Sequence, residues 1–105
     1  MIRVSVFYPN QAGATFDWAY YENTHLPLVR GRLGAALRNF SVDVGLGGGG
    51  PGDPAPFTAI AHLEFESVPA FQAAFGPHAT EIVADIANYS SVAPTNQVSE
   101  IRPVA

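Results

Sequence analysis

Apolar side chains recur at every second position near the start of the chain. In residues 2–8 they fall at Ile2, Val4 and Val6, with polar or larger residues between them. A period of two places these side chains on one face of a β-strand. The same alternation returns in three later segments, so we expect further strands at residues 37–45, 57–66 and 95–102.

Two segments with helical spacing separate these strands. Residues 16–25 follow Thr15, which we expect to cap the N-terminus of a first helix. Pro27 lacks a backbone N–H and disfavours helical torsions in Leu26, so this helix should break there and then restart. A second helix should open at residues 67–69 and be interrupted once, by Gly76 and Pro77.

The resulting element order is β-α-β-β-α-β, within a single domain spanning residues 1–105. Residues 45–56 are almost all glycine, proline and aspartate, and we expect them to form a long hairpin loop. The predicted fold class is α+β and ferredoxin-like. It consists of a four-stranded antiparallel sheet with two interrupted helices on one face.

The composition excludes several classes of partner and cofactor. The chain has a net charge of −4 and no lysine, with five arginines that form no basic stripe, so we expect no nucleic-acid partner. The absence of cysteine excludes disulfides and iron–sulfur clusters. The N-terminus starts directly as a strand and no long apolar run follows, so we expect a cytoplasmic protein without membrane contact. Only 13% of the residues are charged, which suggests a surface shared with another copy.

One face of the predicted sheet has a mixed character. The helices should cover the face that carries Ile2, Val4 and Val6. The opposite face is too apolar for a solvated surface and too polar for a dry core, and we expect it to line a wet cavity closed by a second copy. Its members are Ser5, Phe7, Asn39, Ser41, Thr58, Ile60, His62 and Glu64.

Residues 16–29 contain the aromatic-rich predicted helix and the His25-Leu26-Pro27 break that ends it, and residues 85–89 read Asp-Ile-Ala-Asn-Tyr, followed by Ala-Pro at 93–94. In these segments the chain resembles the EthD family. That resemblance implies a homodimeric α/β barrel with a cavity between each sheet and its helices. It also implies a superfamily that includes monooxygenases, isomerases, cyclases and stress-response proteins.

His25 is the first candidate for chemistry. Trp18, Tyr21 and His25 share one face of the predicted helix, which would set an imidazole beside aromatic walls. Imidazole titrates near neutrality, so His25 is our candidate proton shuttle, and Trp18 and Tyr21 are candidate ligand contacts. Alternatively, His25 hydrogen-bonds backbone groups freed at the Pro27 break.

His62 is the second candidate. It lies on the mixed face near Glu64, whose carboxylate would orient it as a second catalytic or ligand-anchoring group. Ser5 or Ser41 on a neighbouring strand would satisfy it equally well. Residues of the same face are the remaining candidate ligand contacts, namely Ser5, Phe7 and Ile60.

The three histidines are separated by 37 and 16 residues, which is not the spacing of a metal site, so we expect no metal. We therefore predict a cofactor-free enzyme of oxidoreductase, isomerase or cyclase type. It would act on a small apolar or aromatic compound in the cavity of a homodimer. Two alternatives remain, a non-catalytic carrier or stress-type binding dimer and a haem-binding monooxygenase.

Overall fold

The computed structural model describes all residues from Met1 to Ala105. Its four strands are β1 (Ile2–Pro9), β2 (Asn39–Val44), β3 (Phe57–Phe65) and β4 (Thr95–Glu100). The first helical segment comprises α1 (Trp18–Tyr20), η1 (Tyr21–His25), α2 (Leu26–Leu33) and η2 (Gly34–Ala36). The second comprises α3 (Val68–Phe75), η3 (Gly76–His78), α4 (Ala79–Asp85) and η4 (Ile86–Asn88).

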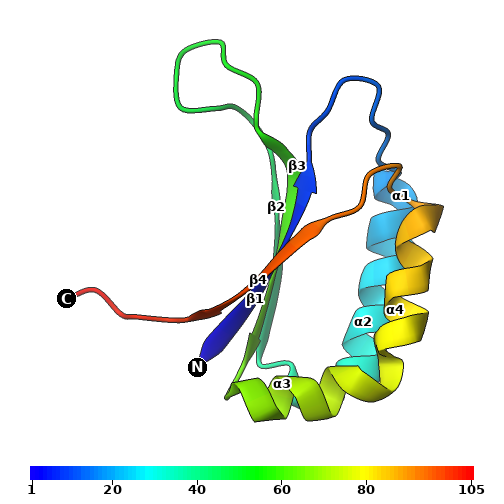
Figure 1. Ribbon diagram of the computed structural model, residues 1–105, viewed down its shortest axis with the longest axis vertical. Helices are drawn as coiled ribbons and strands as arrows, with labels where there is room; N and C mark the ends of the chain where they lie inside the picture. The colour runs from blue at the N-terminus through cyan, green and yellow to red at the C-terminus, as the bar shows by residue number, and fades with distance from the viewer.

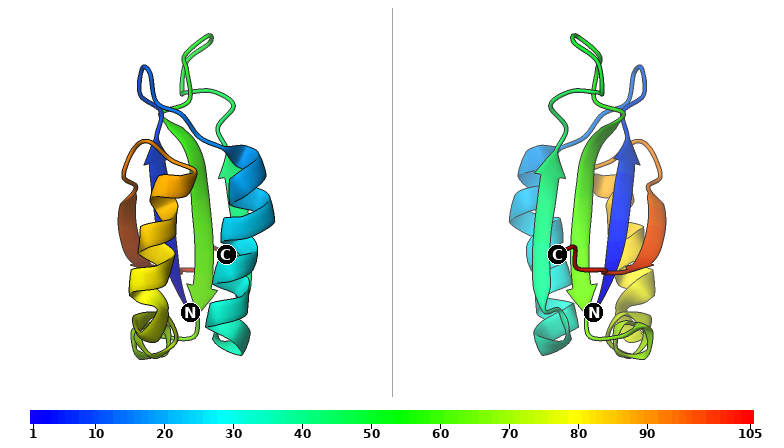
Figure 2. Two further views of the ribbon diagram at one scale, coloured as in Figure 1. Left: turned by 90° about the vertical axis from the view of Figure 1, so that its right-hand side faces the viewer. Right: turned by 90° about the vertical axis from the view of Figure 1, so that its left-hand side faces the viewer.

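The strands form one antiparallel sheet in the order β2-β3-β1-β4. The helices cover one face of this sheet, and no helix covers the other face (Figures 1 and 2). This is the predicted ferredoxin-like β-α-β-β-α-β arrangement. The predicted strands are confirmed, although β2 begins two residues later than expected and β4 ends two residues earlier.

The first helix does not break at Pro27, which corrects our prediction. The chain stays helical from Trp18 to Leu33, and residues Tyr21–His25 form a π-helical turn. At the end of this turn the N–H of Leu26 donates to the carbonyl of Tyr21, five residues earlier. Pro27 cannot donate the next helical hydrogen bond, and a wider local turn accommodates it without ending the helix.

The N-cap of this helix is Asp17. We had expected Thr15 at this position, and that prediction is wrong. The side chain of Asp17 accepts a hydrogen bond of 3.1 Å from the backbone N–H of Tyr20. Thr15 lies further out, where its backbone N–H donates to the Ser91 hydroxyl at 2.8 Å. The start of the first helix is therefore tied to the segment that follows the second helix.

The interruption of the second helix at Gly76–Pro77 is confirmed. A short 3-10 turn separates α3 from α4, and Figure 1 shows the helix axis changing direction sharply there. This bend lets α3 cross the end of the sheet while α4 runs beside α2 (Figure 2).

The main core lies between the sheet and the helices. Val4, Leu63 and Phe65 of the sheet pack there with Val29 and Leu33 of α2. A second cluster, near the start of α1, is built mainly from tyrosines. No helix combines the length and apolar character needed to cross a membrane.

Candidate functional site

A cavity of about 290 Å³ lies between the sheet and the helices. Fifteen of its seventeen lining residues are hydrophobic, and the two exceptions are His25 and Asn96. His25 reaches the cavity from η1, and Asn96 reaches it from β4. An apolar chamber with very few polar groups is typical of a site for a small apolar ligand.

His25 is held by a carboxylate from the second helical segment. Its Nδ1 lies 2.9 Å from Oδ2 of Asp85, and the side chains are only 6% and 13% exposed. The other oxygen of Asp85 accepts hydrogen bonds from the Tyr20 hydroxyl, at 2.5 Å, and from the Asn88 amide, at 3.0 Å. Asp85 is therefore fixed by three donors, and it fixes the imidazole ring in turn.

This arrangement determines the tautomer of His25. An ionised carboxylate only accepts hydrogen bonds, so Nδ1 of a neutral His25 carries the proton and Nε2 carries a free lone pair. No protein group hydrogen-bonds to Nε2. This atom is not fully buried, so a ligand or water can reach it. The ring can therefore accept a proton at Nε2.

The pKa values of this pair suit a base. Burial lowers the pKa of His25, and the hydrogen bond and charge of Asp85 oppose this effect only in part. Burial would raise the pKa of Asp85, but hydrogen bonds from Tyr20, Asn88 and His25 outweigh it and the net direction is downward. At neutral pH, Asp85 is ionised and His25 is neutral.

Two tyrosine rings pack against this imidazole, and a third tyrosine contacts both of them. The Tyr21 ring stacks on the His25 ring with centroids 5.7 Å apart, and the Tyr89 ring lies 4.5 Å from it. The Tyr8 hydroxyl lies 2.6 Å from the Tyr89 hydroxyl. Burial raises the pKa of all three tyrosines, so each remains a hydrogen-bond donor at neutral pH.

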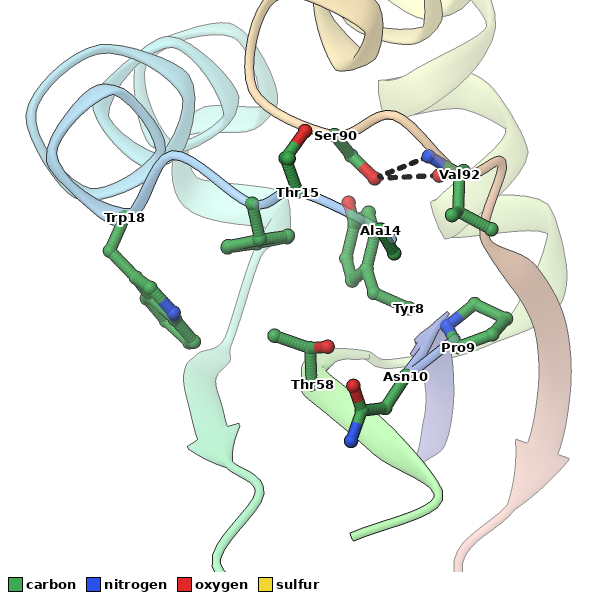
Figure 3. A pocket seen from close by; sticks show the side chains of 10 residues that line it. Tyr8, Pro9, Asn10, Ala14, Thr15, Trp18, Thr58, Ser90 and Val92 are labelled. Atoms are coloured by element: carbon green, nitrogen blue, oxygen red, sulfur yellow. Dashed lines mark hydrogen bonds between the residues drawn. The ribbon is translucent and has the colours of Figure 1, made fainter. Parts of the chain in front are cut away.

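A second, more polar pocket of about 250 Å³ opens at the end of the sheet where β1 finishes. Figure 3 shows Trp18 on one side of it and Ser90 and Val92, joined through the Ser90 hydroxyl, on the other. Tyr8 lines both this outer pocket and the apolar cavity. Tyr8 therefore lies between the two spaces.

The structure brings together only part of the predicted site. His25 and Tyr21 line the cavity, four residues apart on one side of the helix. The Trp18 and Tyr21 rings pack edge to face with centroids 5.7 Å apart, but Trp18 lines the outer pocket and not the cavity.

The remaining predicted residues lie on the other side of the sheet. Ser5, Phe7, Ile60 and His62 alternate with residues of the main core and so point to the uncovered face. The cavity lies on the helix side, where side chains of α2, α3 and α4 line it together with the core face of the sheet. The cavity within this chain is therefore lined by the other face of the sheet. Our expectation that the mixed face lines a cavity closed by a second copy stays a prediction.

The predicted hydrogen-bond partners of His62, namely Glu64 or else Ser5 or Ser41, are wrong. Its Nε2 lies 2.8 Å from Oδ2 of Asp43, while Glu64 pairs with Arg3 at 2.9 Å. Arg3 is directly opposite Glu64 in the sheet register, and it captures the carboxylate that we had assigned to His62. The Nδ1 atom of His62 is buried and has no hydrogen-bond partner.

Sequence reasoning missed Asp85, Asn96, Tyr8 and Tyr89 as site residues. Tyr8 continues the alternation of Val4 and Val6, which identifies its face but not its hydroxyl contact. Asp85 and Tyr89 lie in a segment that we used only for a resemblance. Their contacts with His25 cross 60 or more residues of sequence, so no local pattern indicates them.

Comparisons with known proteins agree on one family. The model of the EthD domain family matches residues 12–93. An EthD-like protein from Ralstonia eutropha JMP134 has 44% identity over 94% of this chain and 89% of that one, with a TM-score of 0.88. An ethyl tert-butyl ether (EthD) family protein from Bacillus halodurans C-125 has 20% identity over 97% and 99% of the two chains, with a TM-score of 0.75.

HapK from Hahella chejuensis shares the fold with 13% identity and a TM-score of 0.60, over 100% of this chain and 96% of that one. No curated protein sequence matches the chain.

Proposed function

The chain belongs to the EthD family, and from this premise we propose that it is an enzyme that moves a proton on a small apolar or aromatic compound held in the apolar cavity. His25 is the proposed proton shuttle. The observation that carries this proposal is the fixed His25–Asp85 pair. Nδ1 of His25 lies 2.9 Å from Oδ2 of Asp85, while Nε2 has no protein partner. The proposed chemistry is of oxidoreductase, isomerase or cyclase type.

Each member of the pair has a separate role in this proposal. Nε2 of His25 takes a proton from the substrate, and the imidazolium that forms is stabilised by the adjacent carboxylate of Asp85. The proton then returns to another atom of the substrate, or to water. Asp85 acts through His25 and is a positioning residue.

The size and lining of the cavity support the ligand class. The family name refers to ethyl tert-butyl ether, a small apolar molecule of a kind that a cavity of about 290 Å³ can hold. With only His25 and Asn96 as polar lining residues, the cavity offers little to charged or sugar-like ligands.

A carbon-acid probe tests the proton shuttle without knowledge of the natural substrate. When a base removes the one C–H proton on the isoxazole ring of 5-nitrobenzisoxazole, the C–H electron pair forms a nitrile, the N–O bond breaks and a coloured phenolate is released. We expect the protein to accelerate this reaction, and His25→Ala to lower the rate by about a hundredfold or more. His78→Ala, outside the cavity lining, should leave the rate unchanged.

A second variant distinguishes positioning from a purely structural role. Asp85→Asn should lower the rate less than His25→Ala. It should also move the midpoint of the pH profile downward, because the hydrogen bond and charge of Asp85 raise the pKa of His25. Equal rates for the wild type and His25→Ala would refute the proposed role of His25.

The apolar lining of the cavity favours a non-catalytic carrier as the second candidate. A carrier would bind small aromatic molecules without accelerating proton removal. Its affinity would also stay nearly flat through the pKa of His25. Binding without turnover in the same experiment would therefore select the carrier.

We also propose that a second copy of the chain covers the uncovered face of the sheet. Register places three rows across this face, one partly apolar, one polar and one charged. The C-terminal segment after β4 projects beyond the sheet on this side (Figure 1). The rows are Asp43–Ile60–Phe7–Thr95, Ser41–His62–Ser5–Gln97 and Asn39–Glu64–Arg3–Ser99.

A further inference from the structure

The apolar cavity is open along one side, between β4 and α4. Of its seventeen lining residues only Val83, Asn96 and Val98 are exposed, and all three belong to these two elements. The other lining residues are buried or half-buried, so they close the remaining sides. Figure 2 shows α4 on the β4 side of the sheet, where β4 is the edge strand. A ligand therefore reaches the cavity between β4 and α4.

Asn96 is the polar residue at this opening. It lies directly opposite Val6 in the sheet register, and Val6 packs against the main core, so the Asn96 side chain faces the helix side. The neighbouring Gln97 amide donates to the Ser99 hydroxyl at 2.9 Å, whereas the Asn96 amide has no hydrogen bond to the rest of the chain. Its two N–H donors and its carbonyl oxygen are therefore available to a ligand.

Asn96 lies at the same end of the cavity as His25. Tyr8 follows Val6, the residue opposite Asn96, by two positions on the same face of β1. The Tyr8 and Tyr89 rings pack with centroids 5.8 Å apart, and the Tyr89 ring lies 4.5 Å from the His25 ring. The opposite end of the sheet is crossed by α3 (Figure 1). A ligand group bound by Asn96 is therefore held at the His25 end of the cavity.

The surroundings of Asn96 restrict the kind of group that it can bind. An uncharged oxygen that enters an apolar cavity loses its hydrogen bonds to water, and one amide at the opening can replace such a bond. A carboxylate or an ammonium group would lose far more than one amide returns, because an ion is much more costly to desolvate. A single neutral acceptor is therefore the best match.

We propose that Asn96 donates a hydrogen bond to an uncharged oxygen of the substrate, which makes the substrate a compact apolar molecule with one neutral oxygen acceptor. The apolar body fills the cavity, and the oxygen stays beside the opening. The carbon atoms that adjoin this oxygen then lie at the end of the cavity that holds His25. This inference rests on the proposed function, because it names the substrate class of the same cavity.

A pair of probes of nearly the same shape tests the role of Asn96 by binding alone. Cyclohexanone carries a ketone oxygen, and methylenecyclohexane has a CH₂ group in its place. We expect Asn96→Leu to weaken cyclohexanone binding roughly three- to tenfold, the effect of one hydrogen bond, without weakening methylenecyclohexane binding. Chemical-shift titration of the full-length protein measures both affinities, and the spectra also report whether each variant is folded.

Two further variants isolate the hydrogen bond from the shape of the side chain. Asn96→Asp keeps the size of the residue, but its ionised carboxylate only accepts hydrogen bonds and cannot donate to a ketone. It should weaken cyclohexanone binding relative to methylenecyclohexane binding. The matched control is Gln72→Leu, which removes an exposed amide of α3 that does not line the cavity. This variant should bind both probes as the wild type does.

The outcomes separate this inference from the proposed function. Equal losses for both probes in Asn96→Leu, or no loss for either, would overturn the role of Asn96 and leave His25 as the proposed base, because the 5-nitrobenzisoxazole assay measures His25 independently. Failure of the wild type to bind either probe would overturn the ligand class proposed for the cavity, and with it this inference.

Discussion

His25 combines two opposing influences at the scale of a single residue. Burial disfavours the positive charge of a protonated His25, while Asp85, at the end of α4, favours it. Burial has the larger effect, so the pKa of His25 is lowered. A histidine that is neutral just below neutral pH is available as a base over the physiological range. The same shift must also affect stability, because the unfolded chain retains an ordinary histidine.

Acidification should therefore destabilise the protein in a window that His25 defines. Below about pH 6.5, His25 is protonated in the unfolded chain but still neutral in the folded protein. The free energy of unfolding therefore falls as the pH falls, until the pH reaches the lowered pKa of His25. Urea unfolding between pH 7.5 and pH 5 measures this slope. The expected result is a shallower slope in His25→Gln and an unchanged slope in His78→Gln.

A slope that is identical in the wild type and His25→Gln would contradict this prediction. Asp85 does not confuse the measurement, because its pKa is lowered from an ordinary value of 3.8 and its contribution is lost only at still lower pH.

At the scale of the element, the first helix presents the site from an irregular segment. The π-helical turn Tyr21–His25 carries both the stacked phenol and the imidazole, and it ends just before Pro27. Turns of this kind are frequent at functional sites. Here the turn keeps the helix continuous, so α2 continues directly from the site into the core through Val29 and Leu33.

The start of this helix should contribute measurably to stability. Asp17→Ala removes the side-chain hydrogen bond to the N–H of Tyr20 and should lower the free energy of unfolding by about 1 kcal/mol. Asp17→Asn retains a capping oxygen and should cost much less. Urea unfolding of the two variants checks this, and equal losses in both would show that the cap is not the cause.

At the scale of the whole molecule, the sheet separates two different environments. The helix side holds the cavity and the His25–Asp85 pair. The uncovered side holds the second pair, His62 with Asp43 at 2.8 Å, together with Phe7 and Ile60. A sheet of this size with an uncovered, partly apolar face is well suited to pairing with a second copy.

A charge placed on the uncovered face should prevent this association. Phe7 lies within the partly apolar row between Ile60 and Thr95, and Phe7→Arg would bury an unpaired charge at the proposed interface, weakening the dimer by about a hundredfold or more. Leu46→Arg, at a loop position that is 96% exposed, should leave the dimer intact. Sedimentation equilibrium measures both, and a monomeric wild type would contradict the proposal directly.

The sequence by itself determined the elements and the family. Alternation in residues 2–8 and 57–66, the turn-forming composition of residues 45–56 and the interruption at Gly76–Pro77 each depend on neighbours in the chain, so local rules were sufficient. The prediction of Pro27 as a break failed because a wider turn is a local alternative to ending a helix, and sequence patterns do not distinguish the two.

Only the tertiary structure decided which side of the sheet holds the cavity and which partners the polar groups take. Asp85 hydrogen-bonds to His25, 60 residues away in the sequence, and Tyr89 hydrogen-bonds to Tyr8, 81 residues away. Glu64 forms its ion pair with Arg3 and not with His62. Such pairings follow from strand register and helix packing. Spacing along the chain places a residue on a face, but the opposing element determines its hydrogen bonds and hence its chemistry.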